Sequence, residues 1–535
     1  MERLLVANRG EIALRIFRTC REEGIATVAV AAPDDLGSLH ARSADRTVEI
    51  ASYLDAAEHV RAARESGADA VHPGYGFLAE SAELAEAVLE AGLVWVGPPP
   101  AALRAGGDKL AAKETARTAG VPVLPTGDPA EIGFPLVVKA AAGGGGRGMR
   151  VVRAAGELDE AVDAARREAA GAFGDDTVFF ERYLERPRHV EIQLLADAHG
   201  HVVALGERDC SIQRRHQKVL EESPSAALDP ALRARMSDAA VAFARAIGYV
   251  SAGTAEFMLD GRDFYFLELN ARIQVEHPVT ELVTGIDLVR EQLRIAAGGE
   301  IAPEAYLAGH AVEVRLYAED PRTFLPQAGR IERLRLPDGV RVDAGVESGD
   351  EIGTSYDPMI AKLIAYAPTR ADAYARLDAA LGDTEVGGVT TNLPFLRWLV
   401  AHPVVRAGRA TTAFLTEYPP LSEPPPAAPA ASWSGAWRLN LPAPEPRPVP
   451  DLEAAAQAHG PEAEQSSVTA PMPGTVIKVL VEPGAAVAAR QPLVVLEAMK
   501  METPLVSPYD AIVRAVHVRE GDRVAGGALL VELEE

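Results

Sequence analysis

The stretch "FYFLELNARIQVEHP", residues 264–278, places a polar side chain at every second position. These polar residues are Glu268, Asn270, Arg272, Gln274 and Glu276. In an extended chain they would share one face, and the apolar residues between them would take the other. Carboxylate and amide oxygens two residues apart suit magnesium bound together with nucleotide phosphates. The alternative is a half-exposed strand with a solvated face, but the absence of Lys, Ser and Thr from that face favours a site.

Two other stretches support a nucleotide site. Glu256 in "GTAEFML" is predicted to lie on the neighbouring strand and to add a carboxylate. The segment "FPLVVKAAAGGGGRGMRVV" (134–152) predicts a strand, a glycine loop and a second strand. Such a loop lets backbone N–H groups approach phosphate oxygens, and Lys139 before it would supply a positive charge. A glycine loop alone is also compatible with a flexible turn, and this one matches neither the P-loop nor the dinucleotide fingerprint.

The N-terminal segment predicts a parallel α/β sheet. "RLLVANRG", "EIALRIFRTCREEG" and "IATVAVAA" read as strand, helix and strand, and the same rhythm continues through "DAVHPGYG" and "GLVWVGPPP".

Composition excludes several classes of protein. The 535 residues carry a net charge of −24, which argues against general binding to nucleic acid or anionic membranes and favours a solubility effect. Two distant cysteines, Cys20 and Cys210, exclude a disulfide framework and fit a reducing compartment. The N-terminus has no secretory signal and no apolar run has the length of a membrane helix, so we expect a cytoplasmic protein.

The C-terminal region changes character twice. Residues 419–465 are rich in Pro, Ala and Glu and predict a linker, although the island "SWSGAWRLN" (432–440) is unusually aromatic. Residues 470–497 then align without gaps to 507–534, at a shift of 37 residues. This duplication predicts a flattened β-barrel or sandwich with pseudo-twofold symmetry. The connecting segment "AMKMETPLV" (498–506) places Lys500 at or near the tip of a hairpin.

Lys500 is framed by Met499 and Met501 in "EAMKM". An exposed hairpin lysine can simply deter edge pairing, but flanking methionines suit a surface that other proteins recognise. This motif, preceded by "APMPG", resembles the biotinylation site of biotin carboxyl carrier domains. The resemblance implies biotin joined to Lys500 through an amide by a biotin protein ligase. The related lipoyl domains share the fold but usually lack the Met-Lys-Met frame.

Residues 1–418 resemble a biotin carboxylase of the ATP-grasp superfamily. The similar stretches are "ANRGEIALRI", "HPGYGFLAE", "GDKLAAK", "KAAAGGGGRGMR", "ERDCSIQRRHQK", "ELNARIQVEHPVTE" and "YDPMIAKL". The resemblance implies a Rossmann-like α/β N-terminal subdomain (1–112), an ATP-grasp domain with a mobile lid (113–318) and a C-terminal subdomain (319–418). The linker (419–465) and an all-β biotinyl domain (466–535) would follow.

The resemblance also implies roles for individual residues. For ATP binding, it implies Lys109, Lys139, Gly143, Gly144, Gly145, Gly146, Gly148, Glu181, Leu184, His189, Gln213 and His216. For magnesium or manganese, it implies Glu256, Glu268 and Asn270. For bicarbonate, it implies Lys218, Arg272, Gln274, Val275 and Glu276. The catalytic set would be Glu276, Arg272, Lys218 and Arg341, with Glu276 as general base and Arg341 facing the biotin ureido oxygen. Cys210 and His72 are predicted to be structural.

The implied activity is ATP-dependent carboxylation of carrier-bound biotin by bicarbonate, through carboxyphosphate. The chain would be the α-subunit of an acyl-CoA carboxylase of the acetyl-, propionyl- or methylcrotonyl-CoA type, forming a homo-oligomer within a larger complex. Its partner would be a separate carboxyltransferase β-subunit, because no such domain fits here. The region after "SWSGAWRLN" is also too short for the docking barrel of longer relatives. The alternatives are a subunit of a split pyruvate carboxylase and a non-catalytic biotin carrier or assembly protein.

Overall fold

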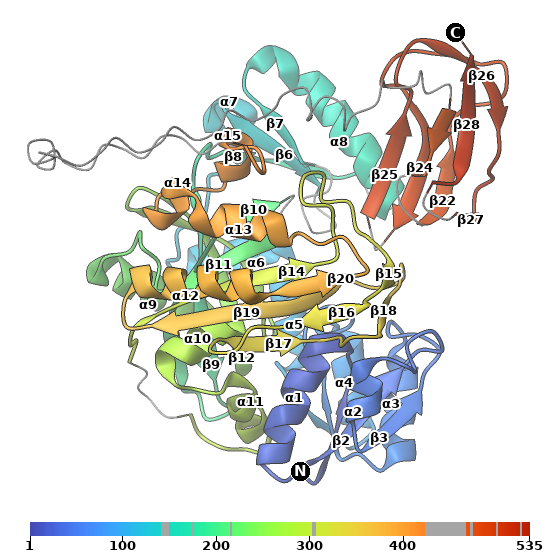
Figure 1. Cartoon of the computed structure of the whole chain (residues 1–535). Coiled ribbons are helices and arrows are strands. Elements are labelled where there is room, and N and C mark those ends of the chain that lie inside the picture. The colour runs from blue at the N-terminus through green and yellow to red at the C-terminus, as the bar shows by residue number, and fades with distance from the viewer. Residues whose placement is uncertain are drawn as a thin grey trace, which may run out of the picture. The chain divides into compact units, whose positions relative to one another are not determined.

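A computed structural model describes residues 1–140, 149–173, 176–214, 217–301, 306–422, 467–470, 474–498, 501–524 and 527–534. The chain forms two compact units, drawn in Figure 1. The larger comprises 1–317, 331–350 and 359–422, and the other comprises 318–330, 351–358 and 423–535.

The N-terminal part of the larger unit is a five-stranded parallel sheet in the order β3-β2-β1-β4-β5. Its strands are β1 (Arg3–Val6), β2 (Ala26–Ala31), β3 (Arg46–Glu49), β4 (Ala70–His72) and β5 (Val94–Trp95). The helices of this part are α1 (Gly10–Glu22), α2 (Leu39–Ser43), α3 (Ala56–Ser66), α4 (Ala82–Glu90) and α5 (Pro100–Gly107). The predicted strand, helix and strand over the first 31 residues are confirmed.

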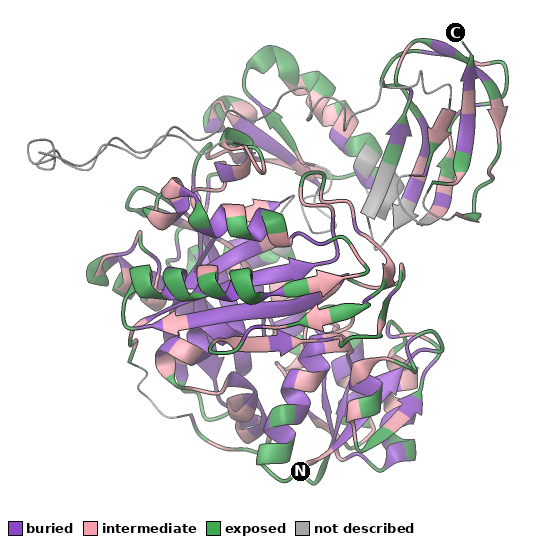
Figure 2. Cartoon of the chain, viewed as in Figure 1, coloured by how far each residue is buried: buried purple, intermediate pink, exposed green. Residues whose placement is uncertain are grey.

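An eight-stranded antiparallel sheet dominates the rest of the larger unit, in the order β13-β12-β9-β10-β11-β14-β19-β17. Its strands are β9 (Arg188–Ala196), β10 (Val202–Arg214), β11 (Gln217–Ser223), β12 (Ser251–Asp260), β13 (Asp263–Asn270), β14 (His310–Tyr317), β17 (Arg341–Ala344) and β19 (Met359–Ala367). Every residue of β14 is buried, so both faces of the sheet are covered at its centre (Figure 2). Both α10 (His277–Thr284) and α12 (Arg370–Asp383) pack against β14.

The remaining elements of the larger unit are mostly short. A three-stranded sheet joins β6 (Leu136–Ala140), β7 (Arg150–Val152) and β8 (Val178–Arg182), and α8 (Leu158–Phe173) packs on it. The other helices are α6 (Lys109–Thr118), α7 (Pro129–Ile132), α9 (Pro230–Ala246), α11 (Leu288–Ala296), α13 (Leu393–Ala401), α14 (Pro403–Arg406) and α15 (Phe414–Glu417). A second small pair joins β16 (Arg333–Arg335) to β20 (Glu385–Gly387). Antiparallel β6 and β7 confirm the predicted strands on either side of the glycine loop.

The stretch that predicted the site is extended over only part of its length. β13 ends at Asn270, and a loop then leads to Glu276, the residue that precedes α10. Pro278 lies in the first turn of that helix, where its missing N–H costs nothing. Arg272, Gln274 and Glu276 therefore come from a loop, and the prediction of one extended face through Glu276 is wrong beyond Asn270.

The C-terminal domain consists of two four-stranded sheets, in the orders β21-β28-β26-β23 and β25-β24-β22-β27. The first half supplies β21 (Ser467–Thr469), β22 (Gly474–Val479), β23 (Ala486–Val487) and β24 (Pro492–Ala498). The second half supplies β25 (Met501–Val506), β26 (Ala511–Val516), β27 (Arg523–Val524) and β28 (Leu529–Glu534). Adding 37 to the bounds of β22 and β23 gives the bounds of β26 and β27. Residues of both sheets share one apolar core, so the predicted duplicated sandwich is confirmed.

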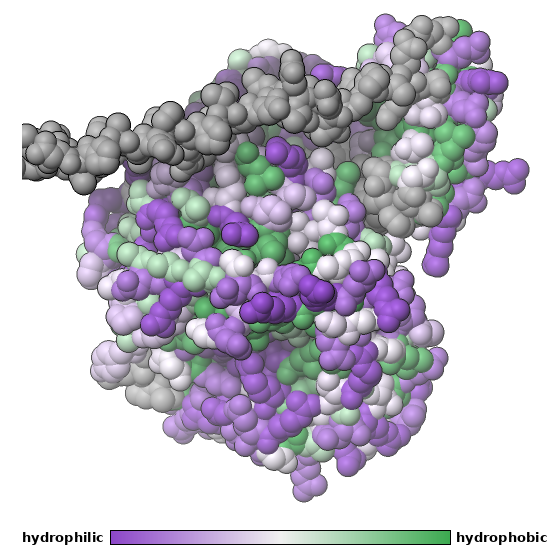
Figure 3. Space-filling view, viewed as in Figure 1, coloured by the Kyte–Doolittle hydropathy of each residue, from purple (hydrophilic) through white to green (hydrophobic). Residues whose placement is uncertain are grey.

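The second unit also contains a small strand pair, β15 (Gly329–Arg330) with β18 (Glu351–Ile352). Among the described residues, no helix combines the length and the apolar character needed to cross a membrane. Hydrophilic residues cover much of the larger unit on the face seen in Figure 3, in keeping with the net charge of −24.

Candidate active site

Three neighbouring strands bring a row of carboxylates together. Glu191 on β9 pairs with Glu256 on β12, which pairs in turn with Glu268 on β13. Paired residues project from the same face of a sheet, so the three side chains form one row. Glu256 and Glu268 were predicted as metal ligands, and Glu256 is confirmed on the neighbouring strand. Glu191 was missed, although "HVEIQ" shows the same alternation of polar and apolar residues as the opening stretch.

Lys218 on β11 connects this row to the proposed general base. Its ammonium lies 2.5 Å from Glu191 Oε2, 2.7 Å from Glu256 Oε1 and 2.6 Å from Glu276 Oε1. Burial alone would lower the pKa of Lys218, but the three carboxylates outweigh it and raise that pKa well above its usual value. The lysine therefore stays charged and holds residues from three other segments at one point.

Glu276 is held by two cations. One carboxylate oxygen accepts from Lys218, and the other accepts from Arg315 Nη2 at 2.9 Å. Burial favours the protonated form of Glu276, but Lys218, Arg315 and Arg208 outweigh burial and lower its pKa well below the usual range. Arg315, on β14, was not predicted, although "VEVRLY" again shows alternating charged and apolar residues.

The predicted metal ligands lie close to each other. Asn270 Nδ2 and Gln274 Nε2 both donate to Glu256 Oε1, at 2.8 and 2.9 Å. Arg272 donates to Asn270 Oδ1 at 2.8 Å and forms an ion pair with Glu80 at 3.3 Å. Burial raises the pKa of Glu256, but Lys218 and His189 outweigh it and lower that pKa well below its usual value. An ionised carboxylate beside a second carboxylate and an amide oxygen is a hard donor set, which fits magnesium or manganese.

Arg208 on β10 supports the site from within the sheet. Its side chain is fully buried and donates to Glu191, Gln193, Thr254, Gln274 and Thr280. Such a guanidinium fixes side chains from several elements at once, because its donors lie in one rigid plane. It lay within a stretch quoted for the resemblance, but nothing in the sequence distinguished it from a surface arginine.

The predicted nucleotide residues gather at β6, β8 and β9. Lys139 on β6 and Lys113 on α6 both form ion pairs with the buried carboxylate of Glu181 on β8. His189 on β9 lies 2.8 Å from Glu256, and Gln213 Nε2 lies 2.9 Å from its other ring nitrogen. The ATP residues and the metal ligands are therefore continuous. Lys113 was missed, since a lysine in a helix carries no distinguishing pattern.

Several predicted residues have less definite positions. Leu184 follows β8 and is half-buried, and Val275 accepts a hydrogen bond from Lys362 at its carbonyl, at 2.8 Å. Lys109 begins α6, and its side chain is not described. The remaining predicted residues lie outside the described residues: Gly143, Gly144, Gly145, Gly146, Gly148, His216 and Lys500. The described strands on either side of residues 499–500 pair, with Ala498 opposite Met501, as a hairpin requires.

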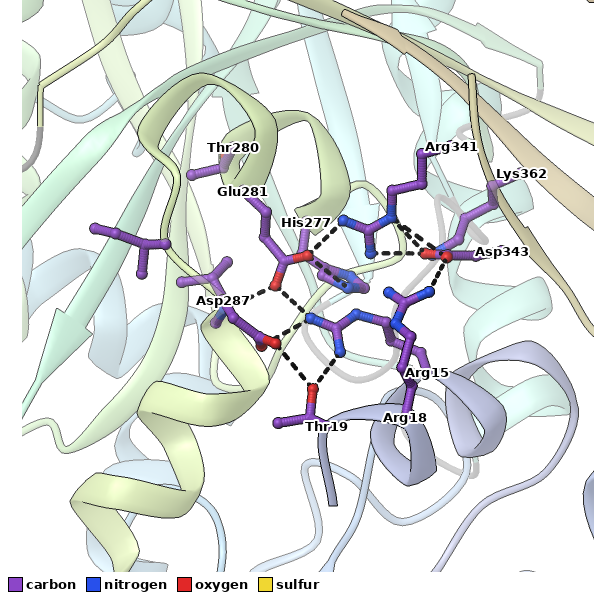
Figure 4. A network of polar contacts seen from close by, with 12 residues as sticks. Arg15, Arg18, Thr19, His277, Thr280, Glu281, Asp287, Arg341, Asp343 and Lys362 are labelled. Carbon is purple, nitrogen blue, oxygen red and sulfur yellow. Dashed lines mark hydrogen bonds and ion pairs between the residues drawn. The ribbon is translucent and has the colours of Figure 1, made fainter. Parts of the chain in front are cut away.

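Arg341 lies in a different cluster from the other predicted catalytic residues. On β17 it donates to Glu281 at 2.7 Å and to Asp343 at 2.8 Å (Figure 4). Arg15 of α1 reaches the other oxygen of Glu281, so this cluster joins α1, α10 and β17. The arginine that contacts the proposed base Glu276 is Arg315. The two arginines look equivalent in sequence, because each lies at an alternating position of a short strand.

Two residues predicted to be structural have structural environments. Cys210 is fully buried, and burial raises the pKa of its thiol well above the usual value, so it does not form a thiolate at neutral pH. His72 is fully buried, contacts Gln292 at 3.2 Å, and has its pKa lowered to about 4 by burial.

Comparisons with known families cover nearly the whole chain. Residues 1–103 match the biotin carboxylase N-terminal domain, 108–303 the ATP-binding domain of the carbamoyl-phosphate synthase L chain, and 313–417 the biotin carboxylase C-terminal domain. Residues 466–533 match the biotin-requiring enzyme domain.

Individual relatives agree with the family matches. The chain is 48% identical over 441 residues to the biotin carboxylase of Halalkalibacterium halodurans, covering 78% of this chain and 98% of the relative. It is 47% identical over 463 residues to the propionyl-CoA carboxylase alpha chain of Ruegeria pomeroyi, covering 78% and 68%. It is 47% identical over 440 residues to a pyruvate carboxylase subunit of Methanothermobacter thermautotrophicus, covering 78% and 90%.

Solved structures agree as well. The biotin carboxylase of Campylobacter jejuni, as a β,γ-ATP complex, matches with a TM-score of 0.76 and 40% identity, covering 78% of this chain and 99% of the other. The biotin carboxylase domain of the Hydrogenobacter thermophilus 2-oxoglutarate carboxylase, bound to MgADP and bicarbonate, matches with a TM-score of 0.76 and 43% identity, covering 78% and 98%. The chain belongs to the biotin carboxylase family. It is an ATP-dependent enzyme that carboxylates biotin, and it carries a biotin-requiring domain.

Proposed function

We propose that Glu276 is the general base on bicarbonate, and that Lys218, Arg272, Gln274 and Val275 hold this substrate beside it. The observation that carries this assignment is the position of Lys218. Its ammonium contacts Glu276 and also Glu191 and Glu256, two of the three carboxylates in the row across β9, β12 and β13. A single buried cation thereby ties the base to the place where a nucleotide-bound cation would lie. We assign the cation to Glu256, Glu268 and Asn270.

The first chemical step transfers one proton and one phosphoryl group. The proton of bicarbonate passes to the carboxylate of Glu276 while a bicarbonate oxygen attacks the γ-phosphorus of ATP. The bond between that phosphorus and the bridging oxygen breaks, and ADP leaves with its electron pair, so carboxyphosphate remains. When the nucleotide is bound, the ammonium of Lys139 would turn from Glu181 to the phosphates. There it neutralises the negative charge that develops on the phosphate oxygens. When bound, the divalent cation supplies further charge neutralisation at the same phosphates.

The carrier part of the proposal rests on Lys500, which we assign as the site where a biotin protein ligase attaches biotin. We also propose that residues 419–465 act as a linker between a catalytic region with boundaries at 112, 318 and 418 and a biotinyl domain over 466–535. A flexible chain of that length has a mean span of about 35–40 Å, which would let the carrier visit distant sites. Shortening this linker should slow carboxylation of the attached biotin but leave carboxylation of free biotin unchanged. Equal loss of both activities would refute this role.

The partner that this chain requires is a carboxyltransferase, as expected of acyl-CoA carboxylase alpha chains. We propose that it lies on a separate β-subunit, that the present chain forms a homo-oligomer within that complex, and that the complex is cytoplasmic. The resemblance to the propionyl-CoA carboxylase alpha chain supports an acyl-CoA as final acceptor. The equal identity to a subunit of a pyruvate carboxylase supports pyruvate as the second candidate.

Three experiments test the proposal. ATP cleavage by the purified chain should depend on both bicarbonate and biotin, and the absence of such cleavage would favour a non-catalytic carrier. Glu276→Gln should abolish the dependence on bicarbonate while the chain still binds ATP. Copurifying the chain with its carboxyltransferase, then supplying acetyl-, propionyl- or methylcrotonyl-CoA or pyruvate, would identify the acceptor.

A further inference from the structure

Arg315 connects the proposed base to a second carboxylate deeper in the sheet. The same guanidinium nitrogen, Nη2, lies 2.9 Å from Glu276 Oε2 and 2.5 Å from Glu221 Oε1. Glu221 lies on β11, three residues after Lys218, and its side chain is fully buried. The single positive charge of Arg315 is therefore divided between two carboxylates, one of which faces the substrates.

A third carboxylate determines which of these residues is charged. Glu313 on β14 lies directly opposite Glu221 in the strand pairing and is fully buried. Among the described residues, the carboxylate oxygens of both glutamates lack a hydrogen-bond partner, and Glu221 differs from Glu313 in its ion pair with Arg315 at 2.5 Å. Two opposed buried carboxylates cannot both be ionised cheaply, and burial raises the pKa of Glu313 well above its usual value. Glu313 is thus protonated at neutral pH, and of the two carboxyl groups Glu221 is the one that carries a negative charge toward Arg315 when it is ionised.

The charge on Glu221 matters because Glu276 lies between two cations. A carboxylate beside Lys218 and Arg315 has a strongly lowered pKa, and a base of low pKa accepts a proton poorly. Ionised Glu221 offsets the charge of Arg315 and so removes part of this depression. When Glu221 is protonated, Arg315 acts on Glu276 alone and makes it a weaker base.

We propose that Glu221 is a positioning residue for the first chemical step: its carboxylate holds Arg315 and offsets its charge, which keeps Glu276 basic enough to accept the proton of bicarbonate. This inference rests on the proposed function, in which Glu276 is that base. Glu221 touches neither substrate nor cation, and it acts only through Arg315.

The surroundings of Glu221 give this role a pH dependence. The titratable and charged groups that face it are Lys218 on its own strand, Cys210 on β10, Glu313 and Arg315 on β14, and Glu276 before α10. Burial raises the pKa of Glu221 to about 7, with Arg315 and Lys218 opposing the rise and Glu276 adding to it. The active form carries ionised Glu221, so the rate of bicarbonate-dependent ATP cleavage should rise as the pH passes upward through this value.

The side chains of α10 do not alter this environment. His277 and Glu281 belong to the separate cluster drawn in Figure 4, where they face Lys362, Arg15 and Arg341. Burial lowers the pKa of His277 well below its usual value. His277 is therefore neutral over the relevant range, and the pH dependence belongs to Glu221.

The test is the pH profile of bicarbonate-dependent ATP cleavage by the full chain and its Glu221→Gln variant. In the variant, the rise of kcat near neutral pH should disappear. At every pH, kcat should equal the value that the wild type has at acidic pH, which we expect to be about tenfold below the wild-type maximum. Such a difference corresponds to a change of about one unit in the pKa of Glu276. KM for ATP should change less than about twofold, since no nucleotide residue is altered. A merely structural role would lower kcat in parallel at all pH values and leave the rise in place, and that result would overturn the inference.

A matched control lies on the next position of the same strand. Glu222 is also buried, but it projects from the opposite face and forms ion pairs with His310 at 2.9 Å and Arg370 at 2.6 Å. Glu222→Gln should keep the wild-type profile, and loss of the rise in this control would refute the assignment to Glu221.

Should Glu221→Gln fail to fold, the Glu221→Asp variant decides. Its retained carboxylate should keep the rise of the rate with pH, at a lower kcat, and a profile without that rise would overturn the inference. Full bicarbonate-dependent activity in Glu276→Gln would instead refute the proposed function itself.

Discussion

The active-site sheet and the carrier domain are both antiparallel β-structures, but different interactions hold them together. The carrier core is apolar, with Val476, Leu493, Val513 and Leu530 at its centre, and its two halves repeat each other at a fixed spacing. The active-site face is instead built from buried charges that meet across the chain, as Lys218 and Glu276 do over 58 residues. Local pattern thus suffices to specify a carrier, whereas a catalytic face depends on which strands become neighbours.

The largest effect should come from Lys500, which the proposed function makes the carrier of the carboxyl group between the two regions. Lys500→Arg should abolish labelling by streptavidin, because a guanidinium cannot form the amide to biotin. Carboxylation of free biotin by the same variant should remain at the wild-type rate, since the catalytic sheet is unchanged. Persistent labelling would show that biotin is attached elsewhere.

The two arginine clusters offer the next test. Arg315→Gln should lower kcat for bicarbonate-dependent ATP cleavage by about 100-fold, because Glu276 loses the donor that orients its carboxylate, and this loss outweighs the gain in basicity from removing the positive charge. Arg341→Gln should leave kcat for the same bicarbonate-dependent ATP cleavage within roughly threefold of the wild-type value, because Arg341 contacts Glu281 and Asp343. It should instead destabilise the chain by about 3 kcal/mol, because Glu281 and Asp343 lose a buried cation. Thermal unfolding and initial rates of bicarbonate-dependent ATP cleavage measured on both variants separate the two roles, and the reverse ranking would contradict the role of Arg315 in the first step.

Glu11 on α1 should make stability depend on pH. Burial raises its pKa from 4.5 to about 7, although Lys362 lies 3.2 Å away. The folded chain therefore keeps this proton after the unfolded chain has lost it, so stability is full below pH 4.5 and decreases as the pH rises to about 7. The loss would amount to about 3 kcal/mol.

Glu11→Gln should reduce this slope in a series of unfolding curves recorded against pH, and the slope that stays belongs to Glu221 and Glu313, whose pKa values burial also raises. Glu86→Gln, which alters an exposed ion pair with Arg104, is the matched control and should leave the slope as it is. An unchanged slope in Glu11→Gln would show that Glu11 does not contribute to it.

The smallest effects should come from the carrier core, where the repeat makes a quantitative comparison possible. Val476 and Val513 occupy equivalent positions, 37 residues apart, and both are buried. Each Val→Ala substitution should therefore destabilise the carrier domain by a similar amount, about 2 kcal/mol. Unfolding of the carrier followed by amide exchange measures both, and a clear inequality would show that the symmetry of the backbone does not extend to the packing.

Much of the site was predictable because its residues alternate along strands. Glu268 lies opposite Glu256 in the strand pairing and Asn270 donates to Glu256, as expected of one site, and Lys218, Gln274 and Glu276 join them. Glu191, Arg208 and Arg315 were not predicted, since each becomes part of the site only because its strand lies beside another that is distant in sequence. The extended face through Glu276 was wrong, because the helix start at His277 and Pro278 turns the chain after Asn270.

By itself, the sequence determined the duplicated carrier, the parallel N-terminal sheet and the types of residue that make up the active site. These features depend on local periodicity, on turn residues and on short motifs, which a single chain displays in order. Only the tertiary structure decided that Arg315 contacts Glu276, and that Lys218 joins three carboxylates. The physical reason is that a buried charge acts over a few ångströms, and the strand order alone sets which charges come that close.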